Sequence, residues 1–479
     1  LNILKKGDLS MSNQPKIGEK KKFQLPHIYV LLFGIIVFCT ILTWIVPAGN
    51  FDRIENESGR MIAVAGTWHP VDQTPVGPFK MFGCIYDGAV DASGIAMTVF
   101  FCFAAVSFVI KSGAFDGLVV YIMKIFKGNS SLIVIPIFMA LIGLGSSTVG
   151  MFEEWLPFIP VFAAIFIGLG YDALVGLAVV ALGEGMGYSG AAMNPFTVGV
   201  AQGIAEVDYM HGAGFRVITH VVMLVIAAFF VMRYAAKIKK DPTKSLVYGD
   251  DFSALVNTDN ADGAKTEFGI QQILVLIDLF GTIVLLIWGV KVKGWYFSEI
   301  TGLFIIMGII AAIIMRYDIN KIGETFEAGF KDAAMAAIMI GIARAVLMVL
   351  NNGNIVDTIV YGFSIPLSHL PIWLSAIAML IMQTILNFFI PSGSGQAAVS
   401  MPIMAPTADL LGIPRDTAVL AYQFGDGLSN IAWPTAFAAV MAGLANVKLE
   451  KWWKFLAPIF GAILVAQAVL IVISLKVLA

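Results

Sequence analysis

The sequence has little charge and little cysteine. Asp, Glu, Lys and Arg make up 13% of its 479 residues, whereas they make up about a quarter of an ordinary soluble domain. Hydrophobic residues account for 58% of the chain, and its mean hydropathy is +0.86. This composition predicts an integral membrane protein. The three cysteines, Cys39, Cys84 and Cys102, have no paired spacing and no histidine cluster, so they indicate neither a disulfide framework nor a metal site.

The sequence also lacks the motifs of ATP-driven pumps and of common hydrolases. It has no GxxxxGK phosphate-binding loop and no Rossmann glycine pattern. Its five histidines are scattered and form no HExxH or Ser–His–Asp arrangement. We therefore expect no enzyme activity, no cofactor apart from Na⁺ or H⁺ as a coupling ion, and no nucleic-acid partner.

Basic residues set the predicted orientation. Four lysines lie just before the first apolar run: Lys16, Lys20, Lys21 and Lys22. By the positive-inside rule the N-terminus is cytoplasmic. The run itself, 27–46, is long enough to cross a membrane, which argues against a cleavable signal peptide. Because the first methionine is Met11, we expect residues 1–10 to lie outside the natural reading frame.

The apolar runs and the positions of the basic residues together divide the chain into six segments. They are a cytoplasmic basic segment (1–26), a first span with an extracytoplasmic loop (27–80), a first repeat (81–235), a cytoplasmic linker (236–268), two connecting spans (269–316) and a second repeat (317–479). We predict an all-α, multi-pass protein of the plasma (inner) membrane, with about nine transmembrane helices and two re-entrant hairpins.

Polar and irregular stretches interrupt the apolar segments at two places. The hairpins, 131–169 and 371–411, carry GSST and SGSGQ near their tips. The spans 173–206 and 416–445 contain GEGMGYSG and GDGLSN, which we expect to break the helix, each followed by proline. Such backbone is tolerated at membrane depth only where protein or a water-filled cavity surrounds it. The alternative is that the small residues merely allow close helix packing and that the prolines only kink a helix.

The two halves resemble each other. Gly113–Asp116 corresponds to Asn354–Asp357, Gly170–Asp172 to Pro414–Asp416, and Gly183–Gly185 to Gly425–Gly427. The first copy is predicted to start outside and end inside, and the second to start inside and end outside. This is the inverted repeat of secondary transporters, which bind substrate at the midplane on broken helices.

Thirteen residues are predicted to bind substrate, because they supply hydroxyls, amides or charges at the tips and breaks: Ser146, Ser147, Thr148, Glu153, Glu154, Asn194, Arg344, Ser392, Ser394, Gln396, Asp426, Asn430 and Thr435. For the coupling ion we name Glu184, Asp426, Gly145 and Gly393, since carboxylates and freed carbonyls suit a cation. A carboxylate at the bilayer centre costs about 2.5–3.5 kcal/mol and needs a partner. Arg344 is the expected counter-charge, pairing with Asp426 or Glu153 or holding a substrate carboxylate. A static salt bridge is the alternative for each acid.

Four stretches carry a family resemblance: GMFEEWLPF, AAMNPFTVGVAQGIA, FIPSGSGQAAVSMPIMAP and YQFGDGLSNIAWPT. They closely resemble the YfcC family of membrane carriers, which is related to ArcD-type arginine/ornithine exchangers and is often labelled C4-dicarboxylate-carrier-like. The resemblance covers nearly the whole chain from about residue 23. The wider ion transporter superfamily implies inverted repeats, two hairpins, a homodimer and an elevator motion of the hairpin-bearing domain. The exchanger branch lacks an acid at the position of Asp426, and Glu184 is not a fixed feature of the family.

Three functions follow as hypotheses. The first is a secondary transporter of amino-acid-like carboxylates, with basic amino acids such as arginine or ornithine as substrates, since the pocket should be more negative on the side of the first repeat. The second is a Na⁺- or H⁺-coupled transporter of C4-dicarboxylates or other short-chain carboxylates, in which Arg344 holds the carboxylate. The third is a channel or intramembrane enzyme, which paired hairpins and the missing catalytic motifs disfavour.

Overall fold

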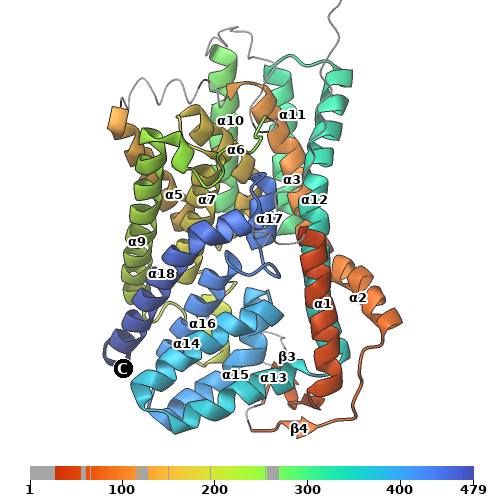
Figure 1. Ribbon diagram of the computed structural model, residues 1–479, viewed down its shortest axis with the longest axis vertical. Helices are drawn as coiled ribbons and strands as arrows, with labels where there is room; N and C mark the ends of the chain where they lie inside the picture. The colour runs from red at the N-terminus through yellow and green to blue at the C-terminus, as the bar shows by residue number, and fades with distance from the viewer. Residues whose placement is uncertain are drawn as a thin grey trace, which may run out of the picture.

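The computed structural model describes residues 27–55, 61–64, 66–114, 117, 128–148, 150–194, 196–253, 255 and 269–478, and this part of the chain is almost entirely helical (Figure 1). Three sequence predictions fall wholly or mostly outside these residues. They concern the basic segment 1–26, the short stretch 114–127, whose Lys124 and Lys127 predict an interfacial helix rather than a crossing, and the later part of the linker, 254–268.

The first half of the chain forms these helices: α1 (Ile28–Ile45), α2 (Pro78–Asp91), α3 (Ser93–Lys111), η1 (Gly128–Ile133), α5 (Val134–Thr148), η2 (Glu153–Phe158), α6 (Ile159–Gly168), α7 (Ala173–Ser189), α8 (Val198–Ile204) and α9 (Ala213–Lys240). The second half forms η3 (Pro242–Lys244), α10 (Ile270–Trp288), η5 (Gly289–Lys293), α11 (Phe297–Ile314), α12 (Ile319–Asn352), α13 (Val356–Ser364), η6 (Ile365–His369), α14 (Ile372–Phe389), α15 (Gly393–Leu411), α16 (Arg415–Asn430), α17 (Ala438–Leu444) and α18 (Leu449–Val477). The predicted helical membrane fold is confirmed.

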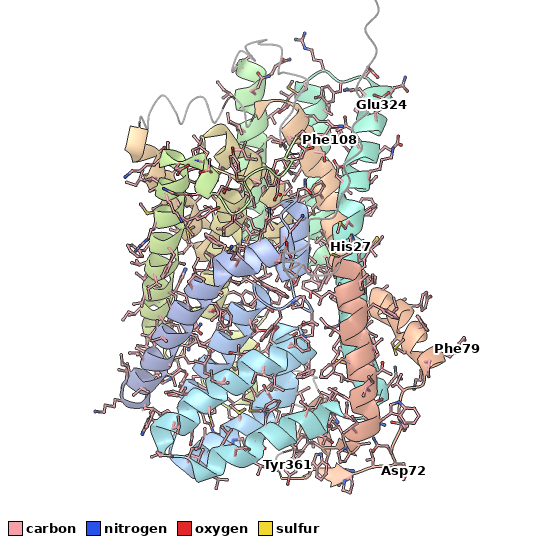
Figure 2. All side chains as sticks on the ribbon, in the orientation of Figure 1. His27, Asp72, Phe79, Phe108, Glu324 and Tyr361 are labelled. Atoms are coloured by element: carbon pink, nitrogen blue, oxygen red, sulfur yellow. The ribbon has the colours of Figure 1, made fainter. Side chains whose placement is uncertain are left out.

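Length and apolar composition qualify eight of the described helices as membrane spans, namely α3, α5 with residues 131–133, α9, α10, α11, α12, α14 and α18. The predicted crossings α1 and α7 are apolar but shorter. Apolar side chains also cover the outside of the bundle. Ile277 and Val284 on α10 are exposed, and Phe79 on α2 points away from the other helices (Figure 2), as expected of surfaces that face lipid. Re-entry of the two hairpins stays a prediction.

The loop after α1 contains short strands that the sequence did not predict. β1 (Gly49–Asn50) pairs with β4 (His69–Pro70), and β2 (Arg53–Glu55) pairs with β3 (Met61–Ala63), both antiparallel. Arg53 forms an ion pair of 2.9 Å with the buried carboxylate of Asp357 on α13. The loop is therefore fastened to the second half of the chain.

The helices form two groups that lie side by side (Figure 1). In the α12 group, α12 packs against α1, α2 and α3, and α11 packs against α3 and α10. In the α7–α16 group, α7 packs against α5, α6 and α9, α16 packs against α14, α15 and α18, and α7 also packs against α16. The two groups meet mainly where η2 contacts α3 and where α17 contacts α12.

The central helices α7 and α16 correct one sequence prediction. Glycine-rich GEGMGY and GDGLSN were expected to break their spans, but both lie inside regular helix. The glycines serve packing instead. A Cβ on Gly187 would lie 2.2 Å from the carbonyl oxygen of Gly143 on α5, and one on Gly425 would lie 2.6 Å from Gln383 Cβ on α14. The helices end only afterwards. α7 ends at Ser189 before α8 begins at Val198, and α16 ends at Asn430 before α17 begins at Ala438; these two intervals are the breaks.

The two halves share an order of elements. In each, a helical pair (α5 and α6, or α14 and α15) precedes a helix that is buried along almost its whole length, a short helix after a break, and a long final helix. This order agrees with the predicted internal repeat. The opposite orientation of the copies and the cytoplasmic N-terminus stay predictions.

Candidate transport site

Ser147 from the first hairpin and Asn194 from the connection itself stabilise the break between α7 and α8. The Ser147 hydroxyl accepts from the amide of Ala192 at 3.1 Å and donates to the carbonyl of Gly190 at 3.3 Å. Asn194 Oδ1 accepts from the amides of Phe196 and Thr197 at 2.9 and 3.3 Å. Buried backbone groups outside a helix require such partners. Ser147 and Asn194 therefore hold the break in shape.

The second break is organised around Asn387, which the sequence reasoning missed. Its Nδ2 donates to Asp426 Oδ1 at 2.7 Å and to Asn430 Oδ1 at 2.9 Å. At the start of α15, the Ser392 hydroxyl accepts from the amide of Gly395 at 3.3 Å and so caps the helix. The tip of the second hairpin thus presents a helix N-terminus beside two buried polar side chains.

A cavity of about 520 Å³ lies between the two helix groups. The α12 group contributes Asp91, Ile300, Ile340 and Arg344, among others. The α7–α16 group contributes the residues after α5, the start of α15 and the second break, including Glu153, Glu154, Ser392, Ser394, Asn430 and Thr435. The cavity is large enough for a small organic ion.

The cavity wall contains more acidic than basic side chains. Its lining contains three carboxylates, on Asp91, Glu153 and Glu154, and one cation, Arg344. Glu154 Oε2 accepts from the amide of Phe152 at 2.9 Å. Arg344 Nε forms an ion pair with Asp91. The prediction that Arg344 pairs with Asp426 or Glu153 is therefore wrong in this structure, because the close approach of α2 to α12 gives Arg344 a nearer acid.

The predicted binding residues divide between the cavity and its surroundings. Seven line it together with Gly393: Glu153, Glu154, Arg344, Ser392, Ser394, Asn430 and Thr435. Six do not line it: Ser146, Ser147, Thr148, Asn194, Gln396 and Asp426. Ser146 and Thr148 donate to carbonyls of their own helix, and Gln396 donates to Gln383. The GSST hydroxyls therefore support the tip rather than face the cavity.

The two buried acids named for the coupling ion lie behind the cavity wall. Glu184 and Asp426 are fully buried. Among the described residues, neither oxygen of Glu184 and only one oxygen of Asp426 has a hydrogen-bond partner. A Cβ on Gly393 would lie 3.2 Å from Asp426 Oδ2, so Asp426 is directly behind the start of α15. Gly145 packs against the ring of Trp155: a Cβ added to Gly145 would lie 3.0 Å from Trp155 Cζ2. This glycine therefore allows close packing.

Asp91 was also missed, although a signal was present. It lies in the apolar run 88–110, which by its length predicts a membrane span, and an ionisable residue at membrane depth marks a functional candidate. Asn387 had a weaker signal, since an uncharged amide in an apolar helix is often a packing residue. Its role depends on contacts with α16 that no local pattern reveals.

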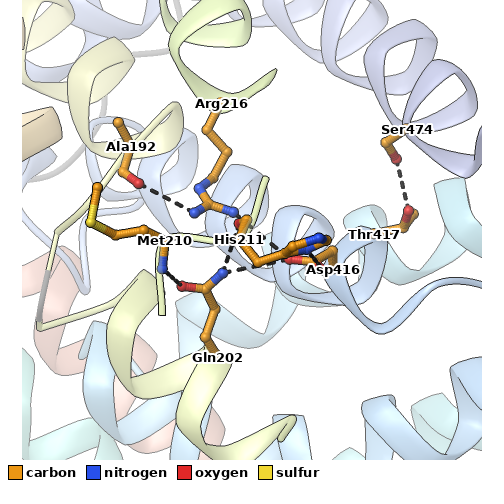
Figure 3. Close-up of polar contacts among 8 residues, drawn as sticks. All are labelled: Ala192, Gln202, Met210, His211, Arg216, Asp416, Thr417 and Ser474. Atoms are coloured by element: carbon orange, nitrogen blue, oxygen red, sulfur yellow. Dashed lines mark hydrogen bonds and ion pairs between the residues drawn. The ribbon is translucent and has the colours of Figure 1, made fainter. Parts of the chain in front are cut away.

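A second polar cluster joins the halves of the chain away from the cavity (Figure 3). Asp416, near the start of α16, contacts His211 Nδ1 at 2.5 Å and Gln202 Nε2 at 3.5 Å. The guanidinium of Arg216 on α9 is fully buried, 4.0 Å from Asp416, and donates to the carbonyl of Ala192 at 3.2 Å. The cluster ties the α8–α9 loop of the first half to α16 of the second.

Replacing Asp416 with asparagine should lower the free energy of unfolding by about 2 kcal/mol, because it leaves the buried Arg216 without a counter-charge. Thermal unfolding of the purified protein in detergent measures this effect. Asp409→Asn is the matched control, since Asp409 pairs with Arg415 at an exposed position and should cost less than about 1 kcal/mol. Equal losses for the two variants would contradict the assigned role of Asp416.

Comparison with known proteins decides the family. The model of the family described as "DcuC: C4-dicarboxylate anaerobic carrier" matches residues 25–476, nearly the whole chain. The chain belongs to the DcuC family. It is therefore a multi-pass membrane transporter and not an enzyme, as the sequence predicted.

Relatives of this DcuC-family chain include two curated bacterial proteins. It is 31% identical to the Escherichia coli (strain K12) protein named "Putative basic amino acid antiporter YfcC", over 94% of this chain and 96% of that protein. It is 28% identical to an uncharacterized Haemophilus influenzae protein, over 96% of this chain and 98% of that one. The resemblance to the YfcC family is confirmed.

Two solved structures are similar to this DcuC-family chain at lower identity. One is Neisseria gonorrhoeae MtrF, of a class of antimetabolite efflux pumps, with 19% identity, a TM-score of 0.44 and coverage of 94% of this chain and 95% of that one. The other is the Alcanivorax borkumensis YdaH transporter, with 15% identity, a TM-score of 0.43 and coverage of 94% and 98%.

Proposed function

We propose that this transporter carries amino-acid-like carboxylates that also bear a positive charge, with basic amino acids such as arginine and ornithine as its substrates. The observation behind the proposal is the charge of the cavity, where three carboxylates and one guanidinium line about 520 Å³. An α-carboxylate fits Arg344, and a cationic side chain fits Glu153 and Glu154. The name of the Escherichia coli relative points to the same class of substrate.

The charge balance disfavours a dianion in this cavity. With all four groups ionised, the formal charge of the lining is −2, from three carboxylates and one guanidinium. Arg344 could hold one carboxylate of a C4-dicarboxylate, but the second would face acids of like charge in a partly desolvated space. A basic amino acid instead meets complementary charge at both ends.

Exchange in proteoliposomes tests the proposal. Vesicles that contain the purified protein and are loaded with L-ornithine should take up labelled L-arginine, and external succinate should compete poorly. Empty vesicles control for leakage. Uptake of succinate with no uptake or binding of any basic amino acid would reject the proposal.

A second candidate is a Na⁺- or H⁺-coupled transporter of C4-dicarboxylates. The family description and the unpartnered oxygens of two buried residues favour it. Asp426 Oδ2 and Asn387 Oδ1 have no hydrogen-bond partner among the described residues, and oxygen ligands suit a small hard cation. Succinate uptake that requires a Na⁺ or H⁺ gradient would support this candidate over exchange.

The motion we propose is an elevator movement of the α7–α16 group against the α12 group. The cavity lies between these groups, so relative movement would change its access without dismantling either wall. A cross-link between cysteines placed at Ile340 and Ser394, on opposite groups, should stop transport reversibly.

We also expect a homodimer, and native mass spectrometry would detect it.

A further inference from the structure

We propose that Asp91 determines substrate selectivity by occupying Arg344 while the cavity is empty, so that a substrate carboxylate binds only by displacing it. Ligands that compensate for the released Asp91 carboxylate with a positive charge are then favoured over simple dicarboxylates. This inference rests on the proposed function, because it specifies how the same cavity chooses its substrate.

The position of Asp91 follows from close packing of α2 on α12. A Cβ on Gly88 would lie 2.5 Å from the backbone nitrogen of Ala345, and one on Gly341 would lie 2.9 Å from the Cα of Ala89. The two backbones therefore touch at these glycines, which fixes the register of the helices. Asp91, the last residue of α2, is thereby placed against Arg344.

The ion pair lies on the cavity wall and not in the packed interior. Both side chains line the cavity, and they are 38% (Asp91) and 25% (Arg344) exposed. An ion pair that water and a ligand can reach exchanges partners easily, because its contribution to stability is small. Arg344 is also the sole cationic residue in the described lining, so a carboxylate ligand has no other guanidinium to bind.

The opposite wall also offers polar groups to a ligand. Thr435 lines the cavity, is only 2% exposed, and its hydroxyl has no hydrogen-bond partner among the residues that the structure describes. Buried hydroxyls are normally paired, so this hydroxyl has unused hydrogen-bonding capacity; its oxygen is itself buried and meets a ligand only after the side chain rotates toward the cavity. Asn430 lines the same wall. The cavity is thus built to receive a polar molecule between Thr435 and the Asp91–Arg344 pair.

Removing the Asp91 charge affects the two ligand classes differently. In Asp91→Asn, Arg344 is free and the formal charge of the lining changes from −2 to −1, because one of its three carboxylates is gone. Both changes favour a dicarboxylate. For L-arginine they oppose each other, since its carboxylate gains a free partner while its net positive charge loses attraction. The ratio of succinate to arginine affinity should therefore rise by about tenfold.

Calorimetric titration of the full-length protein with succinate and with L-arginine, each separately, tests this inference. Asp87→Asn is the matched control, because Asp87 lies one turn earlier on α2, is exposed and does not line the cavity. Asp91→Glu keeps the charge and should keep the wild-type ratio. Adding Arg344→Gln to Asp91→Asn should cancel the gain in succinate affinity.

The outcomes separate this inference from the proposed function. If wild type binds no basic amino acid, the proposed function fails, while stronger succinate binding by Asp91→Asn still supports the role of Asp91. If wild type binds L-arginine but Asp91→Asn leaves the affinity ratio unchanged, the inference is wrong and the proposed function stands. A loss of both ligands in equal measure would show that Asp91 is only structural.

Discussion

Replacing both Glu153 and Glu154 with glutamine should weaken L-arginine binding by at least ~100-fold. The amides keep the shape of the side chains, so the change removes two charges from the cavity wall and little else. Close charge pairs at desolvated interfaces couple by roughly 1.5–7 kcal/mol, and each 1.4 kcal/mol is about a factor of ten in affinity. Calorimetric titration at fixed ionic strength measures the loss.

Glu327→Gln is the matched control for this double variant. Glu327 is an exposed acid on α12, pairs with Lys331 at 2.6 Å and does not line the cavity, so L-arginine affinity should stay at the wild-type value. Succinate affinity of the double variant should rise, because like charges have been removed. Wild-type affinity for L-arginine in the double variant would mean that these acids do not face the substrate cation.

The helices themselves could be predicted from the sequence. Long apolar runs with charged residues at their ends predict α9, α10, α11 and α18, because a membrane-spanning helix requires about 20 consecutive, mostly apolar residues. The same criterion missed α2, which packs against α12. Gly83, Gly88 and two acids interrupt its apolar residues, so the sequence shows no long apolar run there. It also missed the strands after α1, since strands of two or three residues leave no periodic pattern.

The glycine-rich stretches were assigned to the right helices but given the wrong structure. Glycine disfavours an isolated helix by about 1 kcal/mol, which made GEGMGY resemble a break. In the protein, that cost is offset by contact between backbones, as at Gly187 and Gly143. Which of the two effects prevails depends on the neighbouring helix, and a single chain segment does not contain that information.

The sequence predicted some, but not all, of the charged residues of the site. The acidic pair at Glu153 and Glu154 and the internal cation Arg344 were predicted for one pocket, and all three line the cavity. The partner of Arg344 was not, because Asp91 is 253 residues earlier in the chain and reaches it only through the packing of α2 on α12. Pairing between distant residues is a property of the assembled fold.

Replacing Asp426 with asparagine should reduce ion-driven uptake to background, at least ~100-fold below wild type, if this residue holds the coupling ion. The amide can still accept the hydrogen bond that Asn387 donates to Oδ1, so the helices should stay in place. It places an uncharged NH₂ group where Oδ2 has no partner, and this group can neither bind a cation nor carry the exchangeable proton. Proteoliposome uptake with an imposed Na⁺ or H⁺ gradient measures the effect.

Substrate binding distinguishes a coupling role of Asp426 from a direct one. Because Asp426 does not line the cavity, L-arginine affinity of Asp426→Asn should stay within about threefold of wild type, less than 1 kcal/mol. Asp278→Asn is the matched control, since Asp278 is another helical acid with an unpartnered oxygen but lies on α10, outside the cavity lining. It should retain uptake. A joint loss of uptake and arginine affinity in Asp426→Asn would return this residue to the substrate site, as the sequence first suggested, and unchanged gradient-driven uptake would remove it from both roles.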